Sequence, residues 1–288
     1  MKKLILTGML LCSVTFAQEP NPTSEETVKE EAATPKEEAA TPKETDNQGV
    51  AQQEEAKQQA AKQNRLQNGL KFHLWFPNLE GKVAAKGVKQ NVDFDYDDME
   101  DASGIGAGYV YWGDQFGFEA VLGASSQTWE PSGKKTHKVE IDKAMLGVGV
   151  LGHIAKFELA KDLMLGLDGV VGGRVVSLDM KVTKYDPKIK GDDDYTWAEP
   201  YVGATVSLSY AKKYALFTRC DYGGFGIGSA PEHVYNLTFG ASYRATKRIS
   251  IDAGYKIYDI DYKRGSGDDR FIYDIRQEGI FAGFTFYF

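Results

Sequence analysis

Apolar and polar positions alternate strictly through much of the chain from residue 69 to its end. In the last segment Ile280, Ala282 and Phe284 fall on one face, while Gly279 and Gly283 fall on the other. A period of two residues predicts β-strands, because successive side chains of a strand point to opposite faces. No stretch reaches 18 apolar residues, so the pattern predicts no transmembrane helix. The ten strands that we expect cover residues 69–78, 103–112, 115–129, 137–157, 162–184, 195–210, 213–226, 233–245, 248–263 and 271–288.

The connections between these strands are alternately short and long. Tight turns are expected at 113–114, 159–161, 211–213 and 246–247. Longer polar loops are expected at 79–102, 130–136, 185–194, 227–232 and 264–270. Strands of ten or more residues suit a sheet that crosses a bilayer at a tilt, and short turns on one side with long loops on the other are typical of such a sheet. With ten strands, the first strand begins and the last strand ends on the short-turn side.

The two faces of the expected strands differ in character. One face is apolar, with tyrosines near the strand ends, as in the segment 249–257. The opposite face carries many glycines and nine charged residues, namely Glu119, Asp168, Arg174, Glu199, Arg219, Asp221, Arg244, Asp252 and Lys256. A membrane barrel directs apolar side chains toward lipid and polar ones inward, and the sheet must close because every backbone group in lipid must be paired. The sequence therefore predicts an all-β fold, a closed antiparallel transmembrane β-barrel at residues 69–288.

Several segments resemble small outer-membrane β-barrel proteins of Gram-negative bacteria, in the broad OmpA-like or opacity-protein class. The resemblance rests on the Phe-Tyr-Phe sequence that ends at Phe288, on the alternating last strand and on the run Tyr255–Tyr262. Residues 221–226 and 74–77 are also similar to stretches of uncharacterised barrels of this type. The resemblance implies an outer-membrane location and recognition of Phe288 by the barrel-assembly machinery. Proteins of this class and size most often have eight strands, so eight is the alternative to ten.

The N-terminus has the pattern of a secretory signal peptide at residues 1–17. Lys2 and Lys3 precede a short apolar run, and Ala17 is a small residue at the expected cleavage position. Cys12 would suggest a lipoprotein, but Leu11 occupies a position where a lipobox requires a small residue. Removal of this segment leaves Cys220 as the single cysteine, so the mature chain is expected to have no internal disulfide and no cysteine-cluster metal site.

Residues 18–68 are expected to form a disordered periplasmic extension. They are rich in Glu, Ala, Gln and Pro, lack aromatic residues and repeat the heptapeptide Glu-Glu-Ala-Ala-Thr-Pro-Lys twice from Glu30 to Lys43. Pro35 and Pro42 recur in the two copies and exclude a continuous helix. Such a segment buries too little apolar surface to offset its chain entropy. Residues 50–66 contain helix formers and would at most form a solvated helix.

Composition and charge exclude several classes of function. The chain has 288 residues with a formal net charge of −7, and 42% of its residues are hydrophobic. This composition excludes a collagen-like or wholly disordered chain, and the acidic balance argues against a nucleic-acid-binding protein, which needs a basic patch. No motif in the sequence predicts a cofactor.

The nine charged residues of the predicted interior have two interpretations. In a narrow barrel they would pair with one another and close the lumen, because an unpaired interior charge is costly. Alternatively they would line a polar path for small solutes, as in a porin-like channel, although narrow barrels usually fill with their own side chains. The first interpretation is the preferred one.

Acidic residues gather in the expected outer loops, at 93–101, 192–194 and 268–269. Hard oxygen ligands suit Ca²⁺ or Mg²⁺, but the first group fails the EF-hand pattern at Asp98 and Gly104. We therefore predict solvated acidic loops and no metal site. Such loops could contact lipopolysaccharide through bridging divalent cations.

Catalysis is not expected from this sequence. His137 and His233 lie near the outer ends of expected strands, where a membrane-embedded hydrolase would place such groups, but no residues fall at a diagnostic spacing. The glycine-rich run 223–228 lies in a strand pattern without a following helix, which argues against a phosphate-binding loop. The sequence thus predicts a structural outer-membrane barrel surrounded by lipid and lipopolysaccharide, with a narrow channel and then a hydrolase as alternatives.

Overall fold

The computed structural model describes residues 67–85, 92–94, 99–130, 136–267 and 270–288. The predicted signal peptide, nearly all of the predicted extension and parts of the acidic loops lie outside these residues. Among the described residues no helix is long and apolar enough to cross a membrane. The strands are β1 (Gln67–Ala84), β2 (Val92–Phe94), β3 (Met99–Trp112), β4 (Phe116–Trp129), β5 (His137–Ala160), β6 (Leu163–Tyr185), β7 (Lys188–Tyr210), β8 (Tyr214–Gly224), β9 (His233–Arg244), β10 (Ile249–Arg264) and β11 (Phe271–Tyr287).

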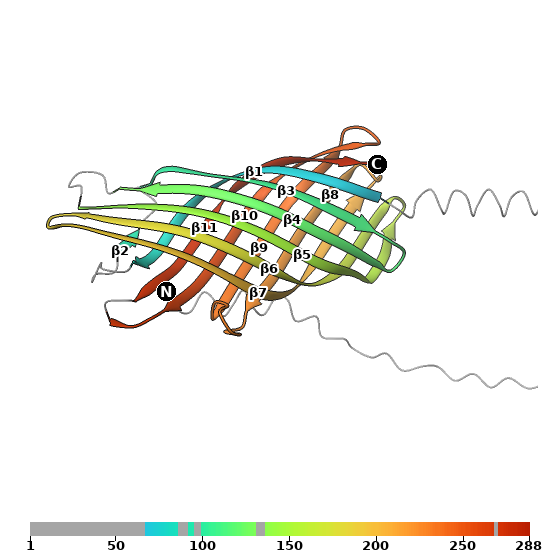
Figure 1. Ribbon diagram of the computed structural model, residues 1–288. Coiled ribbons are helices and arrows are strands. Elements are labelled where there is room, and N and C mark those ends of the chain that lie inside the picture. The colour runs from blue at the N-terminus through green and yellow to red at the C-terminus, as the bar shows by residue number, and fades with distance from the viewer. Residues whose placement is uncertain (1–66, 86–91, 95–98, 131–135, 268–269) are drawn as a thin grey trace, which may run out of the picture. The chain divides into compact units, whose positions relative to one another are not determined.

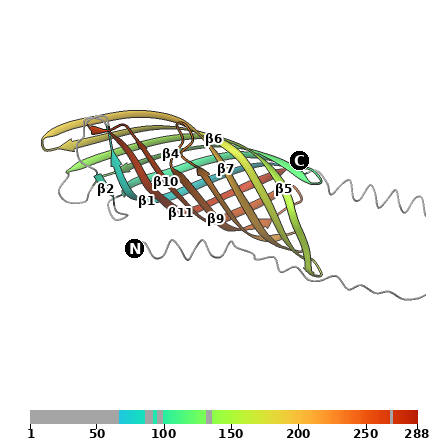
Figure 2. The same ribbon diagram turned by 90° about the horizontal axis from the view of Figure 1, so that it is seen from below.

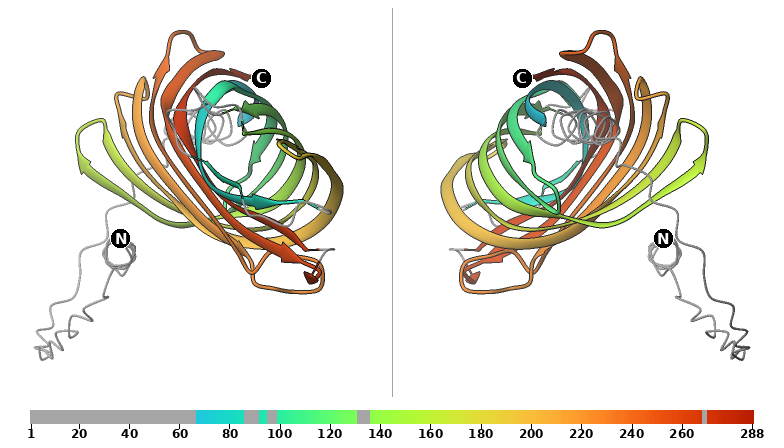
Figure 3. Two further views of the ribbon diagram at one scale, coloured as in Figure 1. Left: turned by 90° about the vertical axis from the view of Figure 1, so that its left-hand side faces the viewer. Right: turned by 90° about the vertical axis from the view of Figure 1, so that its right-hand side faces the viewer.

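Ten of these strands form a closed antiparallel barrel (Figure 1). From β3 to β11 each strand pairs with its sequence neighbours, and β1 pairs with both β3 and β11. The β1–β11 ladder runs from Gly69–Tyr287 to Ala84–Ile272, so the closing seam is paired along nearly its whole length. The short β2 adds to the outer end of β1. The expected closed barrel of ten strands, rather than eight, is confirmed, and views along it show the strands as a ring (Figure 3).

Short turns gather at one end of the barrel, as expected, but the opposite end differs from the prediction. The segment 185–194 was expected to be a long polar loop. Instead β6 and β7 continue to a two-residue turn at Asp186–Pro187, so this prediction is wrong. Likewise β1 extends to Ala84 and β3 begins at Met99, inside the loop expected at 79–102. The long strands slant across the barrel and extend well beyond the shorter ones (Figure 2).

An apolar band surrounds the outside of the barrel. Its exposed members include Leu70, Phe72, Leu74, Phe76, Ile105, Phe118, Leu122, Leu146, Val148, Val150, Val171, Val175, Val202, Val206, Leu216, Phe239, Ile251, Ile280 and Phe284. Tyr111, Tyr210, Tyr214 and Tyr243 add aromatic rings to this surface near the short-turn end. The shortest strand of the ring, β8, has 11 residues, which is enough to cross the hydrocarbon core at a tilt. So much exposed apolar surface in a continuous band is stable only against lipid.

Beyond this band, toward the long-loop end, the apolar positions change faces. Along β6, Val171 and Val175 point outward and are 61% and 46% exposed, whereas Val176 and Leu178 point inward and are 0% and 1% exposed. The outward positions beyond Val175 are polar, as at Lys181. The alternation therefore continues with its polarity reversed, as expected where a strand leaves lipid and enters water.

The inward side chains of these outer strand halves form a hydrophobic core. Its buried members are Trp75, Leu79, Val83, Ala85, Trp129, Val139, Ile141, Val176, Leu178, Met180, Val182, Trp197, Val234, Tyr258, Ile260, Tyr262, Phe271, Tyr273 and Ile275. The ring of Trp197 stacks on that of Tyr262 with centroids 4.6 Å apart, and Tyr195 lies 4.0 Å from Phe271. The expectation of a polar interior along the whole barrel is thus wrong for its outer part, which packs like a soluble β-sandwich.

Candidate functional site

Five of the nine predicted interior charges form one connected network inside the barrel. Glu119 comes from β4, Arg174 from β6, Glu199 from β7, and Arg219 and Asp221 from β8. All five occupy inward positions of their strands, opposite the apolar band. Arg174 and Glu199 are direct cross-strand neighbours in the β6–β7 ladder.

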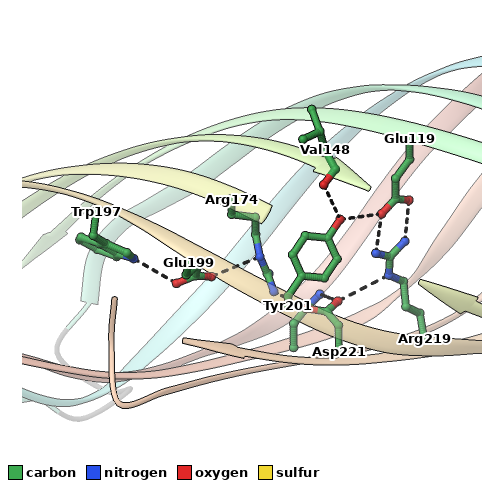
Figure 4. Close-up of polar contacts among 9 residues, drawn as sticks. Glu119, Val148, Arg174, Trp197, Glu199, Tyr201, Arg219 and Asp221 are labelled. Atoms are coloured by element: carbon green, nitrogen blue, oxygen red, sulfur yellow. Dashed lines mark hydrogen bonds and ion pairs between the residues drawn. The ribbon is translucent and has the colours of Figure 1, made fainter. Parts of the chain in front are cut away.

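The two arginines share the three carboxylates (Figure 4). Arg174 donates from Nη2 to Oδ1 of Asp221 at 2.5 Å, and its Nε lies 3.2 Å from Oε1 of Glu199. Arg219 donates from Nη1 and Nη2 to the two oxygens of Glu119 at 2.8 and 2.7 Å, and its Nε lies 3.5 Å from Asp221. The side chains of Arg174, Glu199 and Asp221 are at most 7% exposed. Charge-assisted contacts of this kind offset the desolvation of the buried ions.

Neutral side chains donate further hydrogen bonds to the network. The hydroxyl of Tyr201 donates to Glu119 at 3.0 Å, and the indole of Trp197 donates to Glu199 at 3.0 Å. The amide of Asn236 donates to Asp221 at 2.8 Å. Arg174 also lies over the Tyr201 ring, 4.4 Å from its centroid. Because Trp197 belongs to the hydrophobic core, the network and the core are directly joined.

Two glycines make room for the central tyrosine. A Cβ atom at Gly149 would lie 2.6 Å from the Tyr201 hydroxyl, and one at Gly172 would lie 2.6 Å from the Tyr201 ring and 2.2 Å from a backbone oxygen. Both glycines stand on the inward face, where the sequence predicted glycines. Their role is packing, since a side chain at either position would displace Tyr201 from Glu119.

Two interior lysines lie next to the network. The sequence reasoning missed Lys143, and it predicted Lys256 to be interior without giving it a partner. Lys143, which was missed, donates to Gln277 at 2.6 Å and lies 4.3 Å from the Tyr258 ring centroid. Lys256 lies 4.6 Å from the Trp75 ring centroid. Neither lysine has a carboxylate within 4.0 Å among the described residues. The signal for Lys143 was available in the sequence, because it shares the odd-numbered inward face of β5 with Gly147 and Gly149.

The other predicted interior residues lie apart from the network. Asp168 lies 2.5 Å from Nδ1 of His153, toward the short-turn end. Asp252 accepts a hydrogen bond from Thr285 at 2.9 Å. Arg244 lies over the Tyr287 ring, 4.4 Å from its centroid. Asp168 and Asp252 therefore contact residues of a neighbouring strand rather than residues across the barrel.

The histidines singled out for a possible hydrolase lie apart from the charge network. Nε2 of His233 lies 3.6 Å from a carboxylate oxygen of Asp259. His137 opens β5; burial and then the nearby charge of Lys184 lower its pKa, which favours the neutral imidazole. The pair formed by His153 and Asp168, with Trp112 stacked on the imidazole at 4.3 Å, was not anticipated. Among the described residues the partners of these histidines are carboxylates, a lysine and an indole.

The acidic residues expected in loops lie partly on strands. Asp192 and Asp194 belong to β7, and their carboxylate oxygens gather within 4.8 Å of one another and of Asp179 on β6. Asp179 is also 3.6 Å from Lys181. The acidic side chains at 93–101 and 268–269 lie outside the described residues.

Comparisons with known proteins find distant structural likenesses. No protein-family model matches the sequence, and no curated protein matches it. Similar solved structures include outer membrane protease OmpT from Escherichia coli (11% identity over 77% of this chain and 97% of that chain, TM-score 0.45). They also include Neisserial surface protein A (12%, 77% and 97%, TM-score 0.35) and Ail of Yersinia pestis (11%, 77% and 99%, TM-score 0.31). At TM-scores below 0.5 these likenesses carry no argument.

The chain's own geometry is sufficient to assign its class. Ten antiparallel strands close on themselves, an apolar band covers their outer surface, and a network of paired charges lies inside at that depth. This is the architecture of a small outer-membrane β-barrel protein.

Proposed function

We propose that this protein is a structural, non-conducting barrel of the outer membrane, which presents a rigid hydrophilic projection at the cell surface. The observation that carries the proposal is the filling of the interior by two successive layers. The charge network around Arg174 and Arg219 lies at the depth of the apolar band, and the hydrophobic core around Trp197 lies beyond it.

The charge network opposes passage of ions or polar solutes. Every carboxylate of the network already lies beside an arginine, and Tyr201, Trp197 and Asn236 donate additional hydrogen bonds to these carboxylates. A permeating ion would have to replace these contacts in a site from which water is largely excluded. Breaking a buried ion pair by removing one partner costs roughly 3–5 kcal/mol in proteins, and displacement by a passing ion meets a barrier of the same origin.

The hydrophobic core adds a second barrier of a different kind. Its aromatic rings are packed at contact distance, and Tyr258, Tyr262 and Tyr273 are at most 3% exposed. An ion that entered this layer would lose its hydration among mainly apolar side chains. These contacts argue against the narrow-channel alternative.

The proposed location follows the membrane band and the predicted signal peptide. The first strand of the barrel begins and the last strand ends at the short-turn end. The N-terminal extension would therefore be periplasmic and the long hairpins external. Phe288 follows the last strand and is exposed, which fits the proposed recognition by the assembly machinery. Lipid would surround the apolar band, and lipopolysaccharide would contact the polar surface above it.

Conductance tests this proposal. The full-length protein, folded into planar bilayers, is expected to give no single-channel steps, because both interior layers must be disrupted before ions pass. A general porin inserted under the same conditions serves as the positive control. Reproducible unitary currents from the folded protein, scaling with its concentration, would contradict the proposal and favour the channel.

The absence of enzymatic activity stays a prediction. The hydrolase alternative would rest on His137, on His233 or on the pair of His153 and Asp168, in which Nδ1 lies 2.5 Å from a carboxylate oxygen. We propose no reaction for this barrel.

A further inference from the structure

The outer half of β7 is an open sheet edge. β7 pairs with β6 from Lys188 to Tyr210, but β8 pairs with it only from Tyr201 onward. Residues 188–200 consequently have a neighbouring strand on one side and none on the other among the described residues. An open edge presents backbone groups that are ready to pair with another strand.

The alternation of backbone hydrogen bonds along β7 identifies the residues whose N–H and C=O groups face this edge. Ala211 donates its N–H to the carbonyl of Asp162 next to β6, and Lys213 donates to Tyr210 at the turn into β8. Odd-numbered residues of β7 therefore bond to β6, and even-numbered residues direct their N–H and C=O groups to the other side. Beyond Tyr201 these edge-facing residues are Lys188, Lys190, Asp192, Asp194, Thr196 and Ala198.

The charges at this edge are self-complementary. Lys188 and Lys190 stand on one side of Gly191, and Asp192 and Asp194 stand on the other. In an antiparallel pairing of two copies centred on Gly191, Lys190 faces Asp192 and Lys188 faces Asp194. Even-numbered residues then lie opposite even-numbered residues, and these are the residues whose backbone N–H and C=O groups face the open edge in both copies. Charge of a single sign would repel a second copy, whereas this pattern attracts one.

Charge crowding also favours a second copy over an unrelated strand. The carboxylates of Asp192 and Asp194 lie within 4.8 Å of each other and of Asp179, and only Lys181 is close to this group among the described residues. Lys188 and Lys190 form no ion pair within the part of the chain that the structure describes. Both sets of charges would gain partners at once from the same segment of another chain.

Strand direction decides which membrane the second copy occupies. Two barrels in one membrane are related by rotation about the membrane normal. This rotation leaves the direction of each strand along the normal unchanged, so the projecting β7 strands of the two copies run the same way and cannot pair antiparallel. Copies in two facing membranes can. The hairpin of β6 and β7, which carries this edge, is the part of the described chain that projects furthest (Figure 1).

We propose that the β7 edge at Lys188–Asp194 pairs antiparallel with the same edge of a second copy in an opposing membrane, so that the barrel is a homotypic surface adhesin. Each contact is small, and many copies between two membranes would give avidity. This inference goes beyond the proposed structural function and does not depend on whether the lumen conducts.

Two isomeric variants test the proposal in proteoliposomes that carry the full-length protein. K188D/D194K and K188D/D192K have the same composition and net charge. The first keeps opposite charges across the pairing, and the second sets like charges against each other. Clustering is measured as energy transfer between two labelled vesicle populations. The parent and K188D/D194K are expected to cluster, and K188D/D192K is expected to fall to the level of protein-free vesicles, with heat-modifiable gel migration checking that each variant is folded.

A competing peptide tests the backbone contacts. A peptide of sequence Lys188–Pro200 is expected to suppress clustering, as is the same peptide N-methylated at Gly191, whereas N-methylation at Lys190 should abolish competition. Equal clustering by the two isomeric variants, or no clustering by the parent, overturns the proposal. So does stronger competition by a lysine-rich peptide of the same length, which would indicate a basic partner instead.

Discussion

Replacing Arg174 with alanine should lower the free energy of unfolding of the barrel by about 3–5 kcal/mol, the range for removing one partner of a buried ion pair. The loss arises because Asp221 and Glu199 remain buried with a missing partner, at 2.5 and 3.2 Å from the atoms removed. Equilibrium urea unfolding of the protein folded in detergent or lipid measures the change. The exposed turn residue Lys212 provides the control, since its replacement by alanine should shift the midpoint little.

A double-mutant cycle separates the ion pair from general packing. Asp221→Ala alone should also destabilise, but adding it to Arg174→Ala should cost much less than the sum, because the two side chains interact directly. An Arg174→Ala midpoint equal to that of the parent would mean that this arginine faces water in an open lumen. Strict additivity in the cycle would mean that the contact between Arg174 and Asp221 does not form.

Replacing Trp197 with alanine should cost about 3–5 kcal/mol, the range for truncating a large aromatic side chain in a core. Trp197 is 1% exposed, its ring stacks on Tyr262, and its indole N–H donates to Glu199. The change leaves a cavity and also removes a donor from a buried carboxylate. Urea unfolding measures the effect, with Phe225→Ala in an exposed turn as the matched aromatic control.

The Trp197 variant distinguishes a packed outer core from a loose vestibule. In a vestibule filled with water, truncating the ring would expose little new apolar surface, and the unfolding midpoint would stay close to that of the parent. Trp197→Phe should retain most of the stacking on Tyr262 and lose the donation to Glu199, so it is expected to fall between the parent and Trp197→Ala.

Much of the fold was predictable because lipid imposes a simple pattern on strands. The alternation at Ile280, Ala282 and Phe284 identified the last strand, and tight turns such as 211–213 fixed the order of the hairpins. The outer core was missed because the reasoning followed a single apolar face. In β6 the odd-numbered apolar series Leu163, Leu165, Leu167, Val171 and Val175 gives way, from Val176 on, to an even-numbered series, and this change of phase is visible in the sequence.

The pairing within the interior was not predictable to the same degree. The nine charged residues follow from strand parity, but their partners depend on register and on the curvature of the sheet. Arg174 and Glu199 are neighbours by register alone. Arg219 and Glu119 come from strands that are not adjacent, so only the closed barrel brings them together. The residues 185–194 were interpreted as a loop because their charges are dense, although β6 and β7 continue through them to the turn at Asp186–Pro187.

Site-specific fluorescence quenching along β6 tests the central claim most directly, namely that apolar side chains contact lipid up to Val175 and pack inward from Val176. In a Cys220→Ala background, single cysteines carry a fluorophore, and brominated lipid and aqueous iodide serve as quenchers. Labels at Val171 and Val175 should be quenched by lipid, a label at Lys181 by iodide, and one at Met180 by neither. Quenching by brominated lipid at Met180, or iodide access at Val171 and Val175, would contradict it.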